Sequence, residues 1–398
     1  MSWEKRKLSE VASLVRGVTF SKAEGVDRPG NGRVPVIRAG SIQKTLLVND
    51  GQIWVPQEKV KPHQLIKEND ILMCTSSGSS DLVGKCAKSD ADYDVSFGAF
   101  CAGIRPDLAK VSPSYLYHFL CSPTFKNWTK NSSGANIKNI RASELAEFEI
   151  PLPPFDEQKR IAEILDKADA IRQKRKQAIA LADEFLRSVF LEMFGDPVTN
   201  PKGWEEPILS DIADVRSGVT KGKKLKEGTG ITLPYMRVAN VQDGYLDLSS
   251  IQTITVSEKD AEKCKLLRGD ILLTEGGDPD KLGRGHVWNG EIDNCIHQNH
   301  IFSVRVKDED YVRPAFLSAV IGSQRGKRYF LKVGKQTTGI ATINKTVLSE
   351  FCPIVPPLEL QDSYLKIASR IKRMQTRKHY HEVTLFPSLS QKAFSGQL

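Results

Sequence analysis

The longest regular pattern of apolar and polar positions occupies residues 151–195. Pro151, Pro153 and Pro154 hold the chain extended, and apolar or small residues then recur three and four positions apart, as in a heptad seam. Charged residues and glutamine fill the other faces. We therefore predict one long helix that buries a narrow stripe against a partner helix and ends at Gly195. The seam consists of Ile161, Ile164, Ala168, Ile171, Ala178, Ala182, Phe185 and Val189, interrupted by Arg175.

A second pattern of this kind lies near the C-terminus. Its Pro356-Pro357 pair matches the first proline pair, and Gln361 matches Gln158. Pro387 falls inside the stretch, so we expect this helix to kink or restart near Phe386. The two helices together can form an antiparallel coiled coil. The second seam consists of Tyr364, Ile367, Ile371, Met374, Lys378, His381 and Leu385, with Lys378 at the position of Arg175.

Both helices belong to a larger internal repeat. The run WEKRKLSEVASLVRGVTFSK from Trp3 resembles WEEPILSDIADVRSGVTKGK from Trp204, and NDILMCTSSG from Asn69 resembles GDILLTEGG from Gly269. Each repeat is one globular unit of about 150 residues followed by one long helix. We place the first globular domain at 1–150, the first proline linker and helix at 151–197, the second globular domain at 198–352, and the second linker and helix at 353–398.

Within each globular unit the pattern is mixed. Short β-prone runs alternate with Gly, Asn, Asp and Ser turns, and one helix is expected in each unit, over 113–130 and 314–331, starting at a proline. The predicted fold class is α+β, with two duplicated globular domains, each a mixed sheet with short helices, and two long helices in a pseudo-twofold antiparallel coiled coil. The clearest expected strands are 34–39, 70–74, 251–256 and 300–306.

Composition narrows the class of protein. The 398 residues are 40% hydrophobic and 26% charged, as in globular chains. No apolar run has the length of a membrane helix or the form of a signal peptide, so we expect a cytoplasmic protein. Seven scattered cysteines without C-x-x-C spacing argue against zinc and indicate reduced thiols. A formal net charge of +9 and a pI near 9.0 favour a polyanionic partner, most simply nucleic acid.

Motifs of enzymes are incomplete in this chain. The run LPPF from Leu152 resembles the D/N/S-P-P-Y/F loop of amino-group DNA methyltransferases, but Leu152 lacks the polar side chain that grips the target amino group. Glu157 fits part of a nuclease motif, yet it lies on the first helical turn, where acidic residues are expected. His297 and His300 have no matching pair in the first repeat to support a metal site. We therefore predict no catalytic residue and no bound metal.

Basic and hydrogen-bonding side chains gather in loops at matching places of the two repeats. Lysine and arginine bind phosphates, whereas Asn, Gln, Ser and Thr can pair with base edges. A solvated loop explains any single one of them better, and only the matching places favour DNA binding. The predicted DNA-binding residues are Lys22, Arg28, Ser76, Ser77, Lys85, Lys88, Asn136, Lys138, Lys221, Lys223, Lys224, Lys281, Arg284, Lys335, Gln336, Thr337 and Thr338.

The predicted helix length suggests a bipartite site. A helix of about 38 residues spans roughly 57 Å, which corresponds to about 17 base pairs of duplex. Two different readers held at the ends of an antiparallel pair would recognise two half-sites separated by an unread gap.

The order of these parts closely resembles the specificity subunit of type I restriction-modification systems over essentially the whole chain. The motifs that carry the resemblance are I-x-L-P-P-x-x-E-Q-x-x-I from Ile150, G-D-I-L from Gly269 and the ending A-F-S-G-Q-L from Ala393. Two positions depart from the pattern, because Asn69 replaces the glycine of the first G-D-I-L run and Leu360 replaces the glutamate of the second E-Q pair.

The resemblance implies a non-catalytic reader of double-stranded DNA with two target-recognition domains, each specifying one half of a split target. It implies two modification subunits that methylate adenine with S-adenosylmethionine, and restriction subunits that use ATP and Mg, while this chain binds no cofactor itself. The helices would act as ruler and docking surface, and Arg175 and Lys378 could fix register or face a partner. The alternatives are a stand-alone DNA methyltransferase or nuclease, and a coiled-coil or RNA-binding adaptor.

Overall fold

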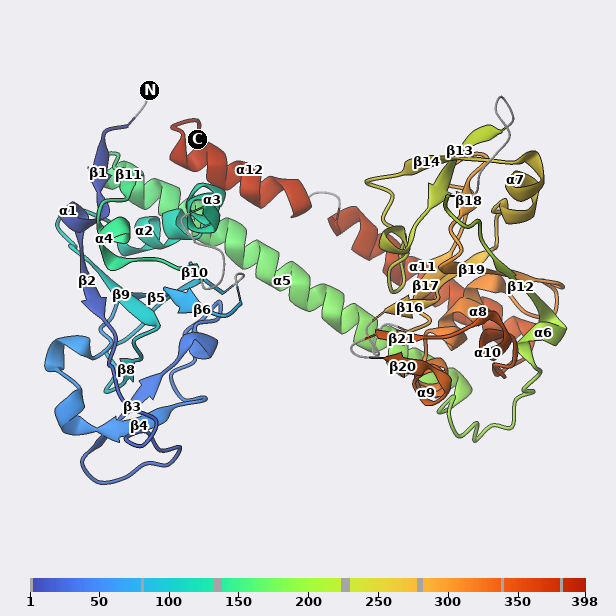
Figure 1. Ribbon diagram of the computed structural model, residues 1–398, viewed down its shortest axis with the longest axis horizontal. Helices are drawn as coiled ribbons and strands as arrows, with labels where there is room; N and C mark the ends of the chain where they lie inside the picture. Colours follow the sequence, from blue (N-terminus) through green and yellow to red (C-terminus); the bar gives the residue numbers. More distant parts are fainter. Residues whose placement is uncertain are drawn as a thin grey trace. The chain divides into compact units, whose positions relative to one another are not determined.

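The computed structural model describes residues 3–79, 82–131, 138–222, 230–277, 282–337, 340–379 and 382–398. The side chains at 131, 138, 335–337, 340, 374–379, 382–385 and 387 lie outside this description. The chain divides into two compact units (Figure 1). Unit 1 comprises Met1–Ala178 and Thr376–Leu398, and unit 2 comprises Ile179–Gln375. None of the described helices is long and apolar enough to cross a membrane.

Unit 1 is built on two β-sheets. Its strands are β2 (Ala12–Arg16), β3 (Arg33–Ile37), β4 (Ile53–Pro56), β5 (Ile71–Cys74), β7 (Cys86–Lys88), β8 (Ser96–Phe97) and β9 (Cys101–Pro106). The larger sheet is antiparallel, with strand order β2-β9-β5-β7. The smaller sheet has the order β4-β3-β8, in which β3 and β8 run parallel. A short ladder of β1 (Lys5–Lys7) and β11 (Glu149–Pro151) closes the unit.

The two larger sheets of unit 2 repeat this topology strand for strand. Its strands are β12 (Ala213–Ser217), β13 (Ile231–Met236), β14 (Gln252–Val256), β15 (Ile271–Thr274), β17 (Gly285–Val287), β18 (Ile296–His297) and β19 (Ile301–Val306). The sheets have the orders β12-β19-β15-β17 and β14-β13-β18, with β13 and β18 parallel. The predicted duplication, the mixed sheet and all four of the clearest expected strands are confirmed.

Each helix predicted inside a globular unit is in fact two helices. Unit 1 has α2 (Pro113–Leu120) and α3 (Pro123–Asn131), and unit 2 has α8 (Pro314–Ile321) and α9 (Gln324–Val333). In each unit a serine lies between the two helices, and its hydroxyl accepts a hydrogen bond from an amide of the second helix. Ser122 Oγ accepts from the Phe125 amide at 3.3 Å, and Ser323 Oγ accepts from the Arg325 amide at 3.2 Å. Serine is favoured as an N-cap, so it starts a new helix.

Several short helices complete the two units. The α-helices are α1 (Leu8–Val11), α4 (Ala142–Ala146), α6 (Leu209–Ile212), α7 (Glu258–Cys264) and α10 (Lys345–Ser349), and the 3-10 helices are η1 (Ala39–Ser41), η2 (Gln57–Lys59), η3 (Pro62–Gln64) and η4 (Val238–Asn240). α1 and α6 occupy matching places directly before β2 and β12.

The long helix predicted after the first proline linker is α5 (Phe155–Phe194), with 40 residues. Its first turns lie in the core of unit 1, where Ile161 and Leu165 are fully buried in a cluster that also contains Ala393. Its last turns lie in the core of unit 2, where Phe190 and Phe194 contact the ring of Tyr364. The first turns of α5 therefore pack near Ala393, and its last turns pack against Tyr364, which precedes Ala393 in sequence. The second helical stretch thus runs antiparallel to α5 in the contacts within each unit.

The second helical stretch is two helices, α11 (Leu358–His379) and α12 (Glu382–Phe394). The prediction that it restarts near Phe386 is wrong in position, because α12 already begins at Glu382 and Pro387 lies inside it. Arg172 of α5 lies over the ring of Phe386 in α12, with the guanidinium carbon 4.6 Å from the ring centroid. This contact ties α12 to α5 within unit 1.

The residues of the predicted seam are buried at the ends of the helices and exposed in the middle. Ile161, Tyr364 and Ile371 are buried, whereas Ile171 is 52% and Phe185 is 57% exposed. Leu186 takes the place of Phe185 against the core of unit 2. A straight helix drifts about 20° per heptad from a strict seven-residue repeat, so a seam drawn from Ile161 leaves the buried face farther along. Four members of the seam are half-buried: Ile164, Ala168, Arg175 and Ala182. Ile367 packs against the core of unit 2. The side chains of Met374 and Lys378 lie outside the described residues.

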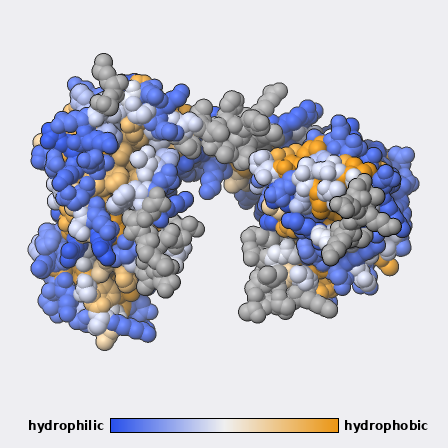
Figure 2. Space-filling model, turned by 45° about the horizontal axis from the view of Figure 1, so that its top comes forward, coloured by the Kyte–Doolittle hydropathy of each residue, from blue (hydrophilic) through white to orange (hydrophobic). Residues whose placement is uncertain are grey.

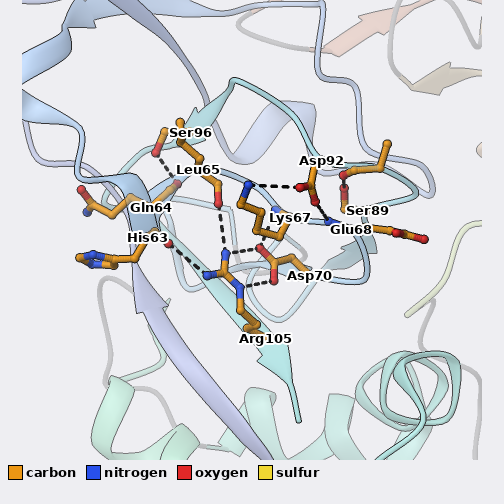
Figure 3. A network of polar contacts seen from close by, with 11 residues as sticks. His63, Gln64, Leu65, Lys67, Glu68, Asp70, Ser89, Asp92, Ser96 and Arg105 are labelled. Atoms are coloured by element: carbon orange, nitrogen blue, oxygen red, sulfur yellow. Dashed lines mark hydrogen bonds and ion pairs between the residues drawn. The ribbon is translucent and has the colours of Figure 1, made fainter. Parts of the chain in front are cut away.

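A buried aspartate anchors the larger sheet in each unit. Asp70 is 1% exposed and accepts two hydrogen bonds from the Arg105 guanidinium, at 2.8 and 2.7 Å (Figure 3). Asp270 is fully buried and accepts from Arg305 at 2.6 and 2.7 Å and from Arg216 at 3.1 Å. The aspartate of the G-D-I-L run is therefore the internal counter-ion of an arginine on β9 or β19.

The residue before this aspartate explains why asparagine can replace glycine there. Gly269 has φ +94° and Asn69 has φ +69°, so both adopt the left-handed conformation. Apart from glycine, asparagine is among the residues that tolerate this region best. The departure at Asn69 therefore leaves the turn unchanged.

Candidate nucleic-acid interface

In unit 1 the structure brings together two of the predicted DNA-binding segments. β6 (Ser76–Ser77) follows β5 directly and pairs antiparallel with β10 (Lys138–Asn139), with Ser77 opposite Lys138 and Ser76 opposite Asn139. The serine-rich turn and the segment before the proline linker are far apart in sequence but form one small ladder. This ladder in unit 1 is called platform 1.

Unit 2 carries an enlarged version at the matching place. β16 (Gly276–Gly277) pairs with β21 (Ile340–Thr342), and β21 pairs with β20 (Lys335–Thr337), giving a three-stranded sheet that is called platform 2. A Cβ at position 276 would lie 2.9 Å from Thr342 Cγ2 and 3.1 Å from the Ala341 carbonyl oxygen. Glycine there allows the two backbones to approach, so the platforms differ in side chains and in strand number.

An exposed ring stands beside each platform. Phe100 is 68% exposed, and its carbonyl oxygen accepts from the Thr75 amide at 2.9 Å and the Ser76 amide at 3.2 Å. His300 occupies the matching position, its carbonyl accepts from the Glu275 amide at 3.0 Å, and its Nδ1 lies 2.7 Å from Glu275 Oε2. The sequence reasoning considered His300 only as a possible metal ligand, and it missed Phe100 because it sought basic and polar residues. The signal was the presence of a ring at aligned positions.

The other predicted DNA-binding residues of unit 1 lie in different surroundings. Lys85 donates to Gln43 Oε1 at 2.6 Å, and Lys88 donates to Ser114 Oγ at 2.7 Å and so points to the start of α2. Lys22 and Arg28 are exposed in the loop that bridges to β4, and no described residue forms an ion pair with either. The platform therefore gathers Ser76, Ser77 and Lys138, whereas these four residues are distributed around the unit.

In unit 2, Lys221 is exposed and Arg284 is half-buried, with its Nε buried and without a hydrogen-bond partner among the described residues. Lys335, Gln336 and Thr337 form β20, of which only the backbone is described. The predicted residues Asn136, Lys223, Lys224, Lys281 and Thr338 lie outside the described residues.

One acidic residue of the loop around Lys22 is held in an ion pair. Lys59 donates to Glu24 at 2.6 Å and, together with the Ser21 amide, holds the pKa of the Glu24 carboxyl at about 2. The Glu24 carboxylate is thereby neutralised internally, whereas a second acidic residue of the loop, Asp27, lies directly before Arg28. In Figure 2 hydrophilic side chains cover most of the visible face of each unit, with smaller hydrophobic areas between them.

No group of three or more His, Cys, Asp or Glu residues in the described parts of the chain is placed to hold a metal ion. His297 is fully buried and its Nδ1 lies 2.9 Å from the Cys264 carbonyl oxygen, while His300 pairs with Glu275, so the two rings serve separate contacts. The described residues on and around the two platforms therefore offer hydrogen-bond donors, cations and exposed rings.

A family model for the type I restriction modification DNA specificity domain matches residues 1–181 and again 201–383. The chain belongs to this family. Two relatives of this specificity protein cover it completely and are named as specificity subunits of type I restriction enzymes. StySPI of Salmonella potsdam is 29% identical, and EcoKI of Escherichia coli (strain K12) is 27% identical, in each case with 89% of the relative's length aligned.

The fold of this specificity protein also occurs in solved structures. A crystal structure of a type I restriction-modification S subunit from M. genitalium matches with a TM-score of 0.57 at 16% identity, covering 99% of this chain and 96% of that one. A chain from a structure on assembly and conformational transition of the type I system matches with a TM-score of 0.52 at 18% identity, covering 100% and 98%.

The E-Q pair of this specificity protein acts through its glutamine. Gln158 is 1% exposed, accepts from the Ser112 amide at 2.9 Å and donates to the Pro153 carbonyl at 2.9 Å. Gln361 is fully buried and does the same with the Arg313 amide at 2.9 Å and the Pro356 carbonyl at 2.8 Å. Glu157, by contrast, forms an ion pair with Arg160 on the helix surface. Leu360 can therefore replace the glutamate, and each glutamine fixes the start of its helix to the unit.

Proposed function

We propose that this chain is the sequence-specific DNA-binding subunit of a type I restriction-modification complex. The domains at 1–150 and 198–352 each read one half of a bipartite double-stranded target. The observation that carries this proposal is the pair of platforms, which have the same place in two units of the same topology but different strands and side chains. A duplicated frame with two different surfaces suits two different half-sites.

The helices supply spacing and assembly in this proposal. α5 is joined to unit 1 through Gln158, and its 40 residues correspond to about 60 Å. Two modification subunits dock on the chain and supply S-adenosylmethionine, and restriction subunits supply ATP and Mg. The chain itself contributes recognition and no catalytic group, and the complex acts in the cytoplasm.

Adenine methylation in cells provides the test. Cells carrying the companion modification subunit should show a split, asymmetric methylated motif only when this chain is also expressed. Exchange of residues 1–150 for the matching domain of a relative with a different target should change one half of the motif and leave the other half and the gap unchanged. A change in both halves would refute separate reading, and a chain-independent motif would refute the function.

The exposed rings should act on separate half-sites. We expect Phe100→Ala to weaken binding to the first half-site by about 10- to 100-fold, because an inserted or stacked ring contributes about 1–3 kcal/mol. His300→Ala should weaken the second half-site to a similar extent. Binding of the assembled methyltransferase to duplexes altered in one half at a time measures both effects. Leu108→Ala is the matched control, since Leu108 is 59% exposed but lies after β9, away from the platform.

A further inference from the structure

One residue stands at the same place at the base of each platform. In unit 1 the Thr75 amide donates to the Phe100 carbonyl at 2.9 Å, and in unit 2 the Glu275 amide donates to the His300 carbonyl at 3.0 Å. The carbonyl of this residue accepts from the amide that follows β10 or β21, at 2.8 Å in unit 1 and 2.9 Å in unit 2. These bonds use the backbone alone, so the frame of each platform does not depend on the side chain at this position.

In unit 2 this position carries a carboxylate. The Glu275 side chain is 30% exposed, and Glu275 Oε2 accepts from His300 Nδ1 at 2.7 Å, because an ionised carboxylate can only accept. None of the residues that the structure describes donates a hydrogen bond to the second oxygen, Oε1. One oxygen therefore orients the exposed His300 ring, and the other faces no described donor.

Unit 1 has no charge at the matched place. Thr75 Oγ1 donates to the Phe100 carbonyl at 3.1 Å and so turns back to its own frame. Neither the threonine hydroxyl nor the phenylalanine ring carries a charge. The two platforms therefore differ at this position in the one property, a negative charge, that strongly limits which part of DNA can come close.

A carboxylate on a surface that binds DNA restricts the groups that face it. It repels phosphates, since like charges brought together in an interface weaken binding. It has no proton to donate, so the acceptors guanine O6 and N7 and thymine O4 cannot bond to it. The donors among the base edges of the major groove are the amino groups of cytosine and adenine. β20 and β21 pair as a two-stranded ribbon, which is an element that the major groove admits.

We propose that Glu275 determines the specificity of unit 2 at one base pair, where it accepts a hydrogen bond from the amino group of a cytosine or adenine in the major groove. The His300 ring, bonded to the other oxygen, fixes the orientation of the carboxylate. This inference rests on the proposed function, because it requires that unit 2 reads DNA. It adds the residue that selects a base and the class of base that is selected.

The test uses the chain assembled with its companion modification subunit, after methylation mapping has given the second half-site. Duplexes carry each of the other three base pairs at each position of this half-site. In the wild type we expect one position at which exchange of cytosine or adenine for guanine or thymine weakens binding by about 10- to 100-fold. Glu275→Thr, which introduces the residue of unit 1, should reduce this loss to less than about threefold and leave the other positions unchanged.

Glu275→Gln separates the charge from the shape of the side chain. A glutamine amide both donates and accepts, and it pairs with N7 and N6 of adenine. The ratio of adenine to cytosine binding at the position that Glu275 controls should therefore rise by about tenfold relative to the wild type. A ratio that stays at the wild-type value would contradict a direct contact.

Two further variants serve as controls. Glu262 is exposed on α7, which packs on the smaller sheet, so Glu262→Thr should leave every position of the half-site unchanged. His300→Phe introduces the ring of unit 1 and keeps the carboxylate, so the preference for an amino-bearing base should remain. Binding to duplexes altered only in the first half should be the same for all variants, which shows that they are folded and assembled.

Three outcomes would overturn the assignment of Glu275. They are an unchanged loss at every position in Glu275→Thr, a wild-type preference for guanine or thymine at the controlled position, and a preference that His300→Phe removes as completely as Glu275→Thr does. The last outcome would make Glu275 a residue that only positions the ring. A methylation map without a chain-dependent motif would instead refute the proposed function and this inference with it, whereas the three outcomes above leave the proposed function intact.

Discussion

Replacing Asp270 with asparagine is expected to lower the free energy of unfolding of unit 2 by about 3–5 kcal/mol, because it leaves two arginines without their counter-ion. The carboxylate is fully buried and accepts hydrogen bonds from Arg305, Arg216 and the Leu267 amide. Asparagine keeps the shape but offers one acceptor oxygen and no charge. The loss is large because the N–H groups of the two guanidinium groups cannot all replace their hydrogen bonds to the carboxylate with hydrogen bonds to water.

The same change at Asp70 should cost less. Among the described residues, Asp70 forms an ion pair with one arginine, Arg105, since Val15 stands in unit 1 where unit 2 has Arg216. Hydrogen exchange of the full chain in urea, followed separately for amides of β5 and β15, measures each unit. Asp92→Asn is the control, because Asp92 is exposed beside Lys67 and should leave the stability of unit 1 nearly unchanged. Equal losses for Asp270→Asn and Asp92→Asn would show that the buried network does not stabilise the sheet.

The architecture could be predicted from the sequence because the same sequence pattern occurs in both halves of the chain. Matching runs around Trp3 and Trp204 and matching proline linkers predicted the same topology in both units, and the strand orders of the two larger sheets agree. The α5 boundaries followed from prolines before the helix and Gly195 after it. Both signals are local in the chain.

The missed features depend on the third dimension. Exposure of Phe185 depends on how far a straight helix rotates over several turns, and a heptad pattern does not contain this. The break at Ser122 depends on a hydroxyl competing for one amide. The pairing of Ser76 with Asn139 joins segments that no periodicity relates, so the platform was visible only as two separate loops.

Acidification is expected to destabilise unit 2 more than unit 1, in which burial lowers the pKa of His118 but the Asp166 carboxylate opposes this effect. Burial lowers the pKa of His297 to about 4, and burial together with the nearby Lys372 lowers the pKa of His286 to about 4. In the unfolded chain both titrate near the ordinary value of about 6.5. Between these values the unfolded state binds protons that the folded state does not, so stability is complete above about pH 6.5 and is lost as the pH falls towards 4. Each histidine contributes at most about 3 kcal/mol to this loss.

Unit 1 provides the matched replacements for this test. Phe97 and Ala87 stand where unit 2 has His297 and His286, and the Phe97 ring lies against Gly103, whose counterpart is Ser303. His286→Ala alone, and His297→Phe combined with Ser303→Gly to make room for the ring, should each remove about half of the pH dependence. Urea unfolding of unit 2 between pH 7.5 and 4.5, followed by hydrogen exchange, measures the slope. A slope that both variants retain would place the acid sensitivity in other groups, whereas its loss would show that unit 2 stays folded at neutral pH partly because these two rings remain uncharged.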